Sequence, residues 1–134
     1  MDAGALIEEA TRRSGVVWVT PEAAGRAQPV WHLWHDGGMY VVTGGIEQPL
    51  EATARATVTV RSNATQADRV VTWVADVSPV PPGSPLWDEL VPLLHAKRLN
   101  APDGEEQPTR WARESVVLRF TPTGETLPLA PDSP

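Results

Sequence analysis

Cysteine is absent from this sequence of 134 residues. Its absence excludes disulfide bonds, thiolate metal sites and a cysteine nucleophile, and it is typical of a reducing cytosol, so we expect a cytoplasmic protein. Basic residues are few and scattered: the chain has one lysine, Lys97, and a net charge of −6. Because proteins bind a phosphate backbone through clustered lysine and arginine, we expect no nucleic-acid partner.

Long hydrophobic runs are absent as well. No stretch approaches the roughly 20 apolar residues that a helix needs to cross a bilayer, and the first residues lack a basic region followed by an apolar segment. We therefore expect neither a membrane partner nor a secretion signal. The length and the 41% apolar content fit one globular domain. We place this domain at residues 1–122, followed by a flexible proline-rich tail at 123–134.

Hydrophobic periodicity predicts a mainly β (α+β) domain. The pattern at Asp2–Ser14 predicts an amphipathic helix, and Ser84 and Pro85 predict the start of a second helix. Ala101–Thr109, which contains two prolines and a glycine, is predicted to be a polar loop. The predicted strands are Val16–Thr20, Pro29–His35, Met39–Thr43, Ala56–Arg61, Val70–Val77 and Ser115–Thr121. Many short strands with a helix before the last one favour a barrel.

The most recognisable pattern in the sequence is a hairpin. The run from Pro29 to Gly45 reads PVWHLWHDGGMYVVTGG and contains two strands joined by an Asp-Gly-Gly turn. It resembles the signature hairpin of the pyridoxamine 5'-phosphate oxidase-like, FMN-binding split β-barrel family. In that family a Pro-Val-Trp-type strand, an acidic-glycine turn and a strand ending in Thr-Gly precede the flavin loop. Further similar segments are Val58–Ser62, Val70–Val77 and Trp87–Asn100.

The resemblance implies a six-stranded split β-barrel with an N-terminal helix and a helix before the last strand. It also implies a homodimer that holds FMN or a deazaflavin in clefts at the subunit interface and transfers hydride on a small-molecule substrate. We expect Thr43, Gly44 and Gly45 near the cofactor ring or ribityl chain. The other candidates are Arg61 and Ser62 for the phosphate, with Trp73, Trp111 and Arg113 as walls.

The loop after Thr43 departs from the family pattern. It carries Glu47 and Glu51 and no cation, where the family holds the cofactor phosphate with lysine or arginine. A phosphate would be repelled by Glu47 unless that side chain turned away. The departure supports a second hypothesis, in which a flavin-less split-barrel dimer is a non-enzymatic binding or scaffold protein with tryptophans at its interface.

Several of these residues also allow a purely structural interpretation. Any one of the six tryptophans is more often a core or interface residue than a ligand-stacking one. The Gly44-Gly45 pair fits a plain turn as well as a close approach to a phosphate. His32 and His35 are expected on opposite faces of one strand without a third ligand, so we expect no metal site.

Overall fold

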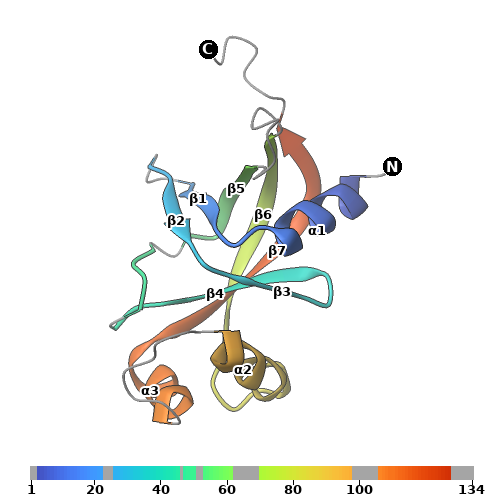
Figure 1. Cartoon of the computed structure of the whole chain (residues 1–134). Helices are drawn as coiled ribbons and strands as arrows, with labels where there is room; N and C mark the ends of the chain where they lie inside the picture. Colours follow the sequence, from blue (N-terminus) through green and yellow to red (C-terminus); the bar gives the residue numbers. More distant parts are fainter. Residues whose placement is uncertain are drawn as a thin grey trace.

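The structure, a computed structural model, describes residues 3–22, 26–45, 47–50, 53–61, 70–97 and 106–127. These residues form a curled antiparallel sheet, a half-barrel, with α1 at its side and the other two helices at its lower end (Figure 1). The helices are α1 (Ala3–Arg13), α2 (Pro85–Lys97) and α3 (Gln107–Glu114). The strands are β1 (Val17–Pro21), β2 (Gln28–Val30), β3 (Leu33–His35), β4 (Gly38–Thr43), β5 (Arg55–Arg61), β6 (Val70–Val80) and β7 (Val116–Leu127).

The strand order in the sheet is β2-β1-β5-β6-β7-β4-β3, with antiparallel neighbours throughout. The described residues therefore form seven strands, where six were predicted. The extra strand arises because the predicted strand Pro29–His35 is interrupted at Trp31 and His32. Before the break the chain pairs with β1, and after it with β4.

A side chain occupies the interruption between β2 and β3. The Gln48 amide accepts a hydrogen bond from the Trp31 backbone N–H at 2.9 Å and donates one to the Trp31 carbonyl at 3.0 Å. The same amide donates to the Val42 carbonyl of β4 at 3.2 Å. Gln48 thus supplies hydrogen bonds that a neighbouring strand would otherwise supply, and the chain can change partners there without leaving these backbone groups unsatisfied.

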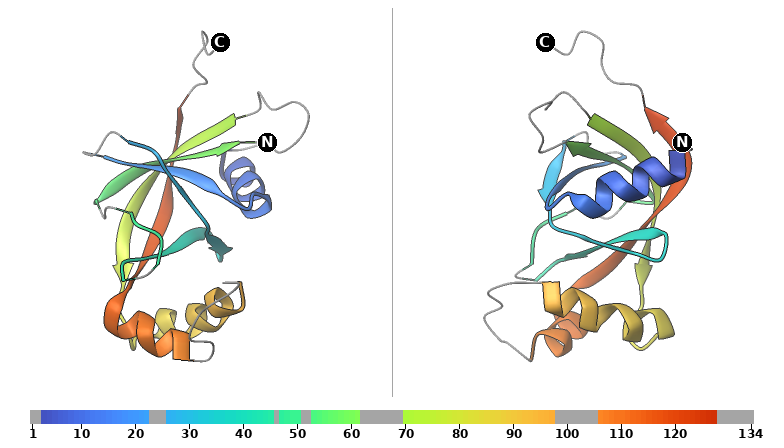
Figure 2. Two further views of the ribbon diagram at one scale, coloured as in Figure 1. Left: turned by 60° about the vertical axis from the view of Figure 1, so that its left-hand side comes forward. Right: turned by 45° about the vertical axis from the view of Figure 1, so that its right-hand side comes forward.

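Two hydrophobic clusters fill the molecule. The first lies inside the curl of the sheet and includes Val19, Val58, Trp73 and Phe120, with Ile7 of α1 packed into it. The second lies between the end of the sheet and the two helices α2 and α3, which lie at that end of the molecule (Figure 2). It comprises Tyr40, Val42, Val80, Trp87, Leu90, Val91, Leu94, Trp111 and Val117. None of the described helices is long and apolar enough to span a bilayer.

Three features of the secondary structure were predicted correctly. The helix at the N-terminus is present, and α2 begins after Ser84, whose hydroxyl accepts a hydrogen bond from the Trp87 backbone N–H at 3.2 Å as an N-cap. The turn at Asp36 and Gly37 has positive φ at both residues, 48° and 81°, as a tight hairpin requires.

Two predicted boundaries were wrong. The stretch predicted as the loop Ala101–Thr109 gives way to a third helix at Gln107, because Pro108 lies in the first helical turn, where its missing N–H costs nothing. The last strand, predicted to end at Thr121, continues to Leu127 and pairs with the start of β6. The rest of the predicted tail, 128–134, lies outside the described residues.

Candidate functional site

The predicted cofactor loop begins where β4 ends. Gly44 and Gly45 follow the strand with φ of 92° and 65°, values that side chains rarely allow, and the Glu47 N–H closes the turn on the Gly44 carbonyl at 3.1 Å. The Thr43 hydroxyl donates to the Gln48 carbonyl at 2.8 Å. The turn is therefore held by its own hydrogen bonds.

Glu47 points into the protein. Its side chain is 1% exposed, and its carboxylate accepts hydrogen bonds from the Arg110 guanidinium at 3.1 Å and from the Trp111 indole N–H at 3.0 Å. Arg110 is itself buried, with 9% of its side chain exposed. The buried acid is thus paired with a buried base from α3, as a buried charge requires. Glu47 has turned away from the surface, and its charge is compensated by that of Arg110.

The two glycines pack directly against the junction of α3 and β7. A Cβ atom on Gly45 would lie 3.2 Å from the Glu114 carbonyl oxygen and 3.3 Å from the Ser115 hydroxyl, which is tighter than most real contacts. The Ser115 hydroxyl donates to the Gly44 carbonyl at 3.0 Å. These glycines therefore allow the α3–β7 junction of the same chain to approach the turn closely. We call this group of contacts between Thr43–Gln48 and Arg110–Ser115 the β4–α3 junction.

The structure brings only some of the predicted site residues together. Thr43, Gly44, Gly45 and Trp111 meet in the β4–α3 junction, and Arg113 lies on the outside of α3, where it is 68% exposed and forms an ion pair with Glu114 at 3.3 Å. Arg61 ends β5, but its side chain is not among the described ones, and Ser62 lies outside the described residues.

Trp73 lies in the first hydrophobic cluster, away from Trp111. It has no exposed surface, its indole N–H donates to the Thr11 hydroxyl of α1 at 3.1 Å, and its ring meets Trp34 edge-to-face with centroids 6.2 Å apart. Trp111 is equally buried in the second cluster. Both tryptophans therefore support the fold from within, and contact of either with a ligand stays a prediction.

Sequence reasoning missed Gln48, Arg110 and Ser115. The signal for Arg110 was present, because Gln107, Arg110 and Trp111 recur at helical spacing after a proline that suits a first turn. These residues form the buried side of α3. The pairing of Glu47 with Arg110 could not be predicted, because it joins residues 63 positions apart in the sequence.

The histidines take separate structural roles. His32 has no exposed surface, and its Nε2–H donates to the Thr11 carbonyl at 2.7 Å. Burial lowers the pKa of His32 to about 4, so the ring is neutral at pH 7. His35 bonds to Glu89 of α2, and His95 bonds to Gln107 of α3 at 2.9 Å. Within the described ranges no three His, Asp or Glu side chains group in a way that could hold a metal ion.

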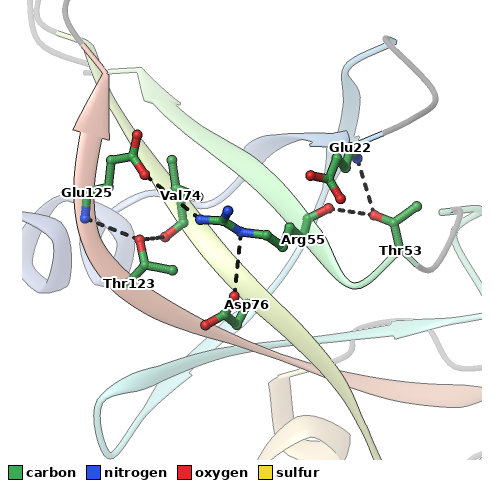
Figure 3. Close-up of polar contacts among 7 residues, drawn as sticks. All are labelled: Glu22, Thr53, Arg55, Val74, Asp76, Thr123 and Glu125. Atoms are coloured by element: carbon green, nitrogen blue, oxygen red, sulfur yellow. Dashed lines mark hydrogen bonds and ion pairs between the residues drawn. The ribbon is translucent and has the colours of Figure 1, made fainter.

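A separate polar network lies on the outer face of β5, β6 and β7 (Figure 3). Arg55 lies between the carboxylates of Asp76 at 3.6 Å and Glu125 at 3.8 Å, and the Thr123 hydroxyl donates to the Val74 carbonyl at 3.1 Å, beside an irregularity in the β6–β7 ladder. All three charged side chains are about half exposed or more. Exposed pairs of this kind contribute little to stability. We therefore describe this network as a charged border of the sheet and not as a support of the fold.

Comparison with known proteins supports the split-barrel fold. No protein-family model and no curated protein matches this sequence. Solved structures do match over most of the chain. A candidate pyridoxamine 5'-phosphate oxidase from Listeria innocua superposes with a TM-score of 0.62 and 12% identity, over 96% of this chain and 98% of that one.

Two further structures extend the comparison to flavin-type cofactors. A FAD-binding protein from Mesorhizobium loti gives a TM-score of 0.61 and 12% identity, over 92% of this chain and 90% of that one. An F420 reductase superposes with a TM-score of 0.59 and 16% identity, over 90% of this chain and 94% of that one. At such identities a likeness establishes the fold alone. This chain has the fold of the pyridoxamine 5'-phosphate oxidase-like split barrels.

Proposed function

We propose that this chain binds FMN or a deazaflavin as a homodimer, with the cofactor at the subunit interface, and transfers hydride on a small substrate. The observation that carries the proposal is the inward turn of Glu47, which is neutralised by Arg110. An exposed Glu47 would repel the phosphate of such a cofactor, and this obstacle is removed. The FAD-binding and F420-reducing proteins of the same fold are similar to this chain and support the choice of cofactor class.

The residues around the β4–α3 junction fit the edge of such a site. The backbone of Thr43–Gly45 would run beside the ring or the ribityl chain, and Arg113 would face the anionic part of the ligand. Arg113 is exposed and its pair with Glu114 is a surface pair, which a stronger anion can replace at little cost. Trp111 and Trp73 would support the site indirectly, because they hold α3 and the sheet in position.

The phosphate would be held by Arg61 and Ser62 at the end of β5. When bound, the flavin ring supplies the hydride chemistry, and the protein supplies orientation and an electropositive grip on the phosphate. A charge-assisted hydrogen bond to a phosphate contributes roughly 1.5–3 kcal/mol, which corresponds to about a tenfold to a hundredfold change in affinity.

The test is a titration of FMN and of riboflavin into Arg61→Ala, followed by fluorescence. We expect Arg61→Ala to weaken FMN binding at least about tenfold and to leave riboflavin binding unchanged, because riboflavin lacks the phosphate. The matched control is Arg13→Ala on α1, which removes an exposed arginine that pairs with Glu9 on the same helix. If Arg61→Ala binds FMN as tightly as the parent chain does, the phosphate assignment is wrong.

The alternative is a dimer without flavin that is a binding or scaffold protein. It is favoured by one specific observation: the polar groups of the turn are bonded within the chain, Thr43 to Gln48 and Gly44 to Ser115. A chain that ignores FMN, riboflavin and deazaflavin but remains dimeric would have this second function.

A further inference from the structure

Two arginines on the outer face of the sheet have opposite surroundings. Arg55 of β5 lies between the carboxylates of Asp76 and Glu125 (Figure 3). Arg119 of β7 points to the same side of the sheet, because its partner in the strand register is Ser78 of β6, two positions from Asp76. Among the described residues, however, no carboxylate lies within ion-pair distance of Arg119.

Arg119 is held against the hairpin of β3 and β4. The residue is partly buried, and its Nε is fully enclosed and has no hydrogen-bond partner. A Cβ atom on Gly38 of β4 would lie 3.6 Å from this Nε. The two terminal guanidinium nitrogens are not among the enclosed atoms. A buried donor without an acceptor costs free energy, so an uncompensated arginine held in this way indicates more than packing.

Tyr40 brings a hydroxyl to the same place. It lies directly opposite Arg119 in the register of β4 and β7, and a Cβ atom on Gly38 would lie 3.5 Å from its hydroxyl oxygen. Tyr40 is 1% exposed, and its hydroxyl makes no hydrogen bond within the described part of the chain. Burial raises the pKa of Tyr40, so the hydroxyl keeps its proton at pH 7 and can donate it to an acceptor. A charged donor and a neutral donor therefore border the space beside Gly38.

Two acidic residues nearby do not neutralise these donors. Glu89 of α2 is bonded to His35 of β3, and Asp36 lies exposed in the hairpin turn. Besides burial, the charges of Arg119, Asp36 and Glu89 act on the pKa of Tyr40, so all three lie close to its hydroxyl. The bond to His35 occupies the Glu89 carboxylate and leaves the guanidinium of Arg119 available to a ligand.

We propose that Arg119 and Tyr40 bind a small carboxylate. The guanidinium of Arg119 supplies a full charge and a fork of donors that matches two carboxylate oxygens, and the hydroxyl of Tyr40 donates to one of them. A phosphate monoester, which carries roughly −1.5 to −2 charge at neutral pH, fits less well. One arginine does not balance that charge, and Asp36 and Glu89 border the site. The ligand class is therefore a monoanionic carboxylic acid.

The experiment is a titration with sodium acetate at pH 7, with sodium chloride at the same ionic strength as reference, followed by the NMR signal of the Gly38 backbone N–H. We expect Arg119→Met to weaken acetate binding about tenfold or more and Tyr40→Phe to weaken it about fivefold. Tyr40→Phe should leave unfolding in urea unchanged, because the hydroxyl has no bond within the described chain to lose. The matched control is Arg55→Met, which removes an arginine of the same face that already has two carboxylates.

Acetate binding that falls in Arg119→Met and Tyr40→Phe but not in Arg55→Met supports the carboxylate site. A parent chain without a saturable response to acetate, or with the same affinity as Arg119→Met, refutes it. Tighter binding of inorganic phosphate than of acetate refutes the ligand class. If circular dichroism shows that Arg119→Met does not fold, Tyr40→Phe decides alone.

The carboxylate site is independent of the proposed flavin site. It shares no residue with the β4–α3 junction or with Arg61 and Ser62, and the titration contains no flavin. Its failure therefore leaves the flavin proposal untouched, and the failure of flavin binding leaves the carboxylate site untouched.

Discussion

The two hydrophobic clusters solve one problem in different ways. Each buries a tryptophan whose indole N–H needs an acceptor: Trp73 donates to the Thr11 hydroxyl in the first, and Trp111 donates to the Glu47 carboxylate in the second. The first arrangement is neutral, and the second is ionic and depends on Arg110. The neutral pair fastens α1 to the inside of the sheet, whereas the ionic one fastens α3 to the predicted cofactor loop. The predicted cofactor loop is thus positioned by the ionic contact, which is the more sensitive of the two to the loss of one partner.

The largest expected effect is the loss of Glu47. Glu47→Leu removes the carboxylate that pairs with the buried Arg110 at 3.1 Å, and breaking a buried pair in this way costs about 3–5 kcal/mol. The free energy of unfolding in urea measures the loss. The double variant Glu47→Leu with Arg110→Met should recover part of it, because it removes both charges of the pair together. No recovery in the double variant would contradict an ionic role for the pair.

Acid should destabilise the fold around the first hydrophobic cluster through protonation of His32, which is bonded to Thr11. In the folded chain the pKa of His32 is lowered to about 4, chiefly by burial, whereas in the unfolded chain it is about 6.5. The unfolded state therefore binds the proton first, and the stability that is fully present above pH 6.5 is lost as the pH falls toward 4. The expected loss is about 3 kcal/mol at pH 4.

This pH dependence is isolated by comparison with a variant. His32→Gln keeps an amide donor near the Nε2 position for the Thr11 carbonyl but does not titrate in this range. The difference between the unfolding free energies of the parent and the variant, measured at each pH, removes the contribution of the carboxylates. A difference that is flat between pH 7 and 4 would show that His32 is not held neutral by burial.

A smaller loss of stability is expected at Thr11, whose hydroxyl accepts the hydrogen bond of the Trp73 indole. Thr11→Val keeps the shape of the side chain but removes the hydroxyl, so the Trp73 indole is left buried and unpaired at a cost of about 1–3 kcal/mol. Thr11→Ser, which keeps the hydroxyl, should cost less. Thermal unfolding of the two variants compares them directly, and a larger loss for Thr11→Ser than for Thr11→Val would mean that the methyl group, rather than the hydrogen bond, holds α1.

The smallest effect is expected at the glycine turn. Gly45→Ala places a Cβ 3.2 Å from the Glu114 carbonyl in a backbone with φ of 65°, so we expect a loss of about 1–2 kcal/mol. The matched control is Gly15→Ala, where a Cβ meets nothing within 4 Å. If the two variants unfold at the same temperature, the contact between the turn and the α3–β7 junction is looser than described.

The sequence predicted the elements that depend on local pattern. The turn at Asp36 and Gly37 and the start of α2 at Ser84 were found because the residues that form them are neighbours. The break in the strand at Trp31 was missed, since it is set by Gln48, 17 positions later. The helix at Gln107 was missed because proline was interpreted as a loop residue rather than a first-turn residue.

The candidate site was less predictable than the fold. From the sequence Glu47 counts as an acid in a polar loop, and only its long-range contact with Arg110 reverses that interpretation. Trp73 and Trp111 were selected as aromatic walls, but whether an aromatic side chain faces a ligand or the core depends on which layer covers it. Here both are covered, by different clusters.

An absorbance spectrum of the purified protein, taken with its native mass before and after addition of FMN or a deazaflavin, tests whether this chain is a flavin- or deazaflavin-binding dimer. We predict a dimer that binds about one chromophore per subunit, with the flavin absorbance shifted from that of the free cofactor. A colourless dimer whose spectrum is only the sum of protein and free flavin would contradict the claim and leave the scaffold function.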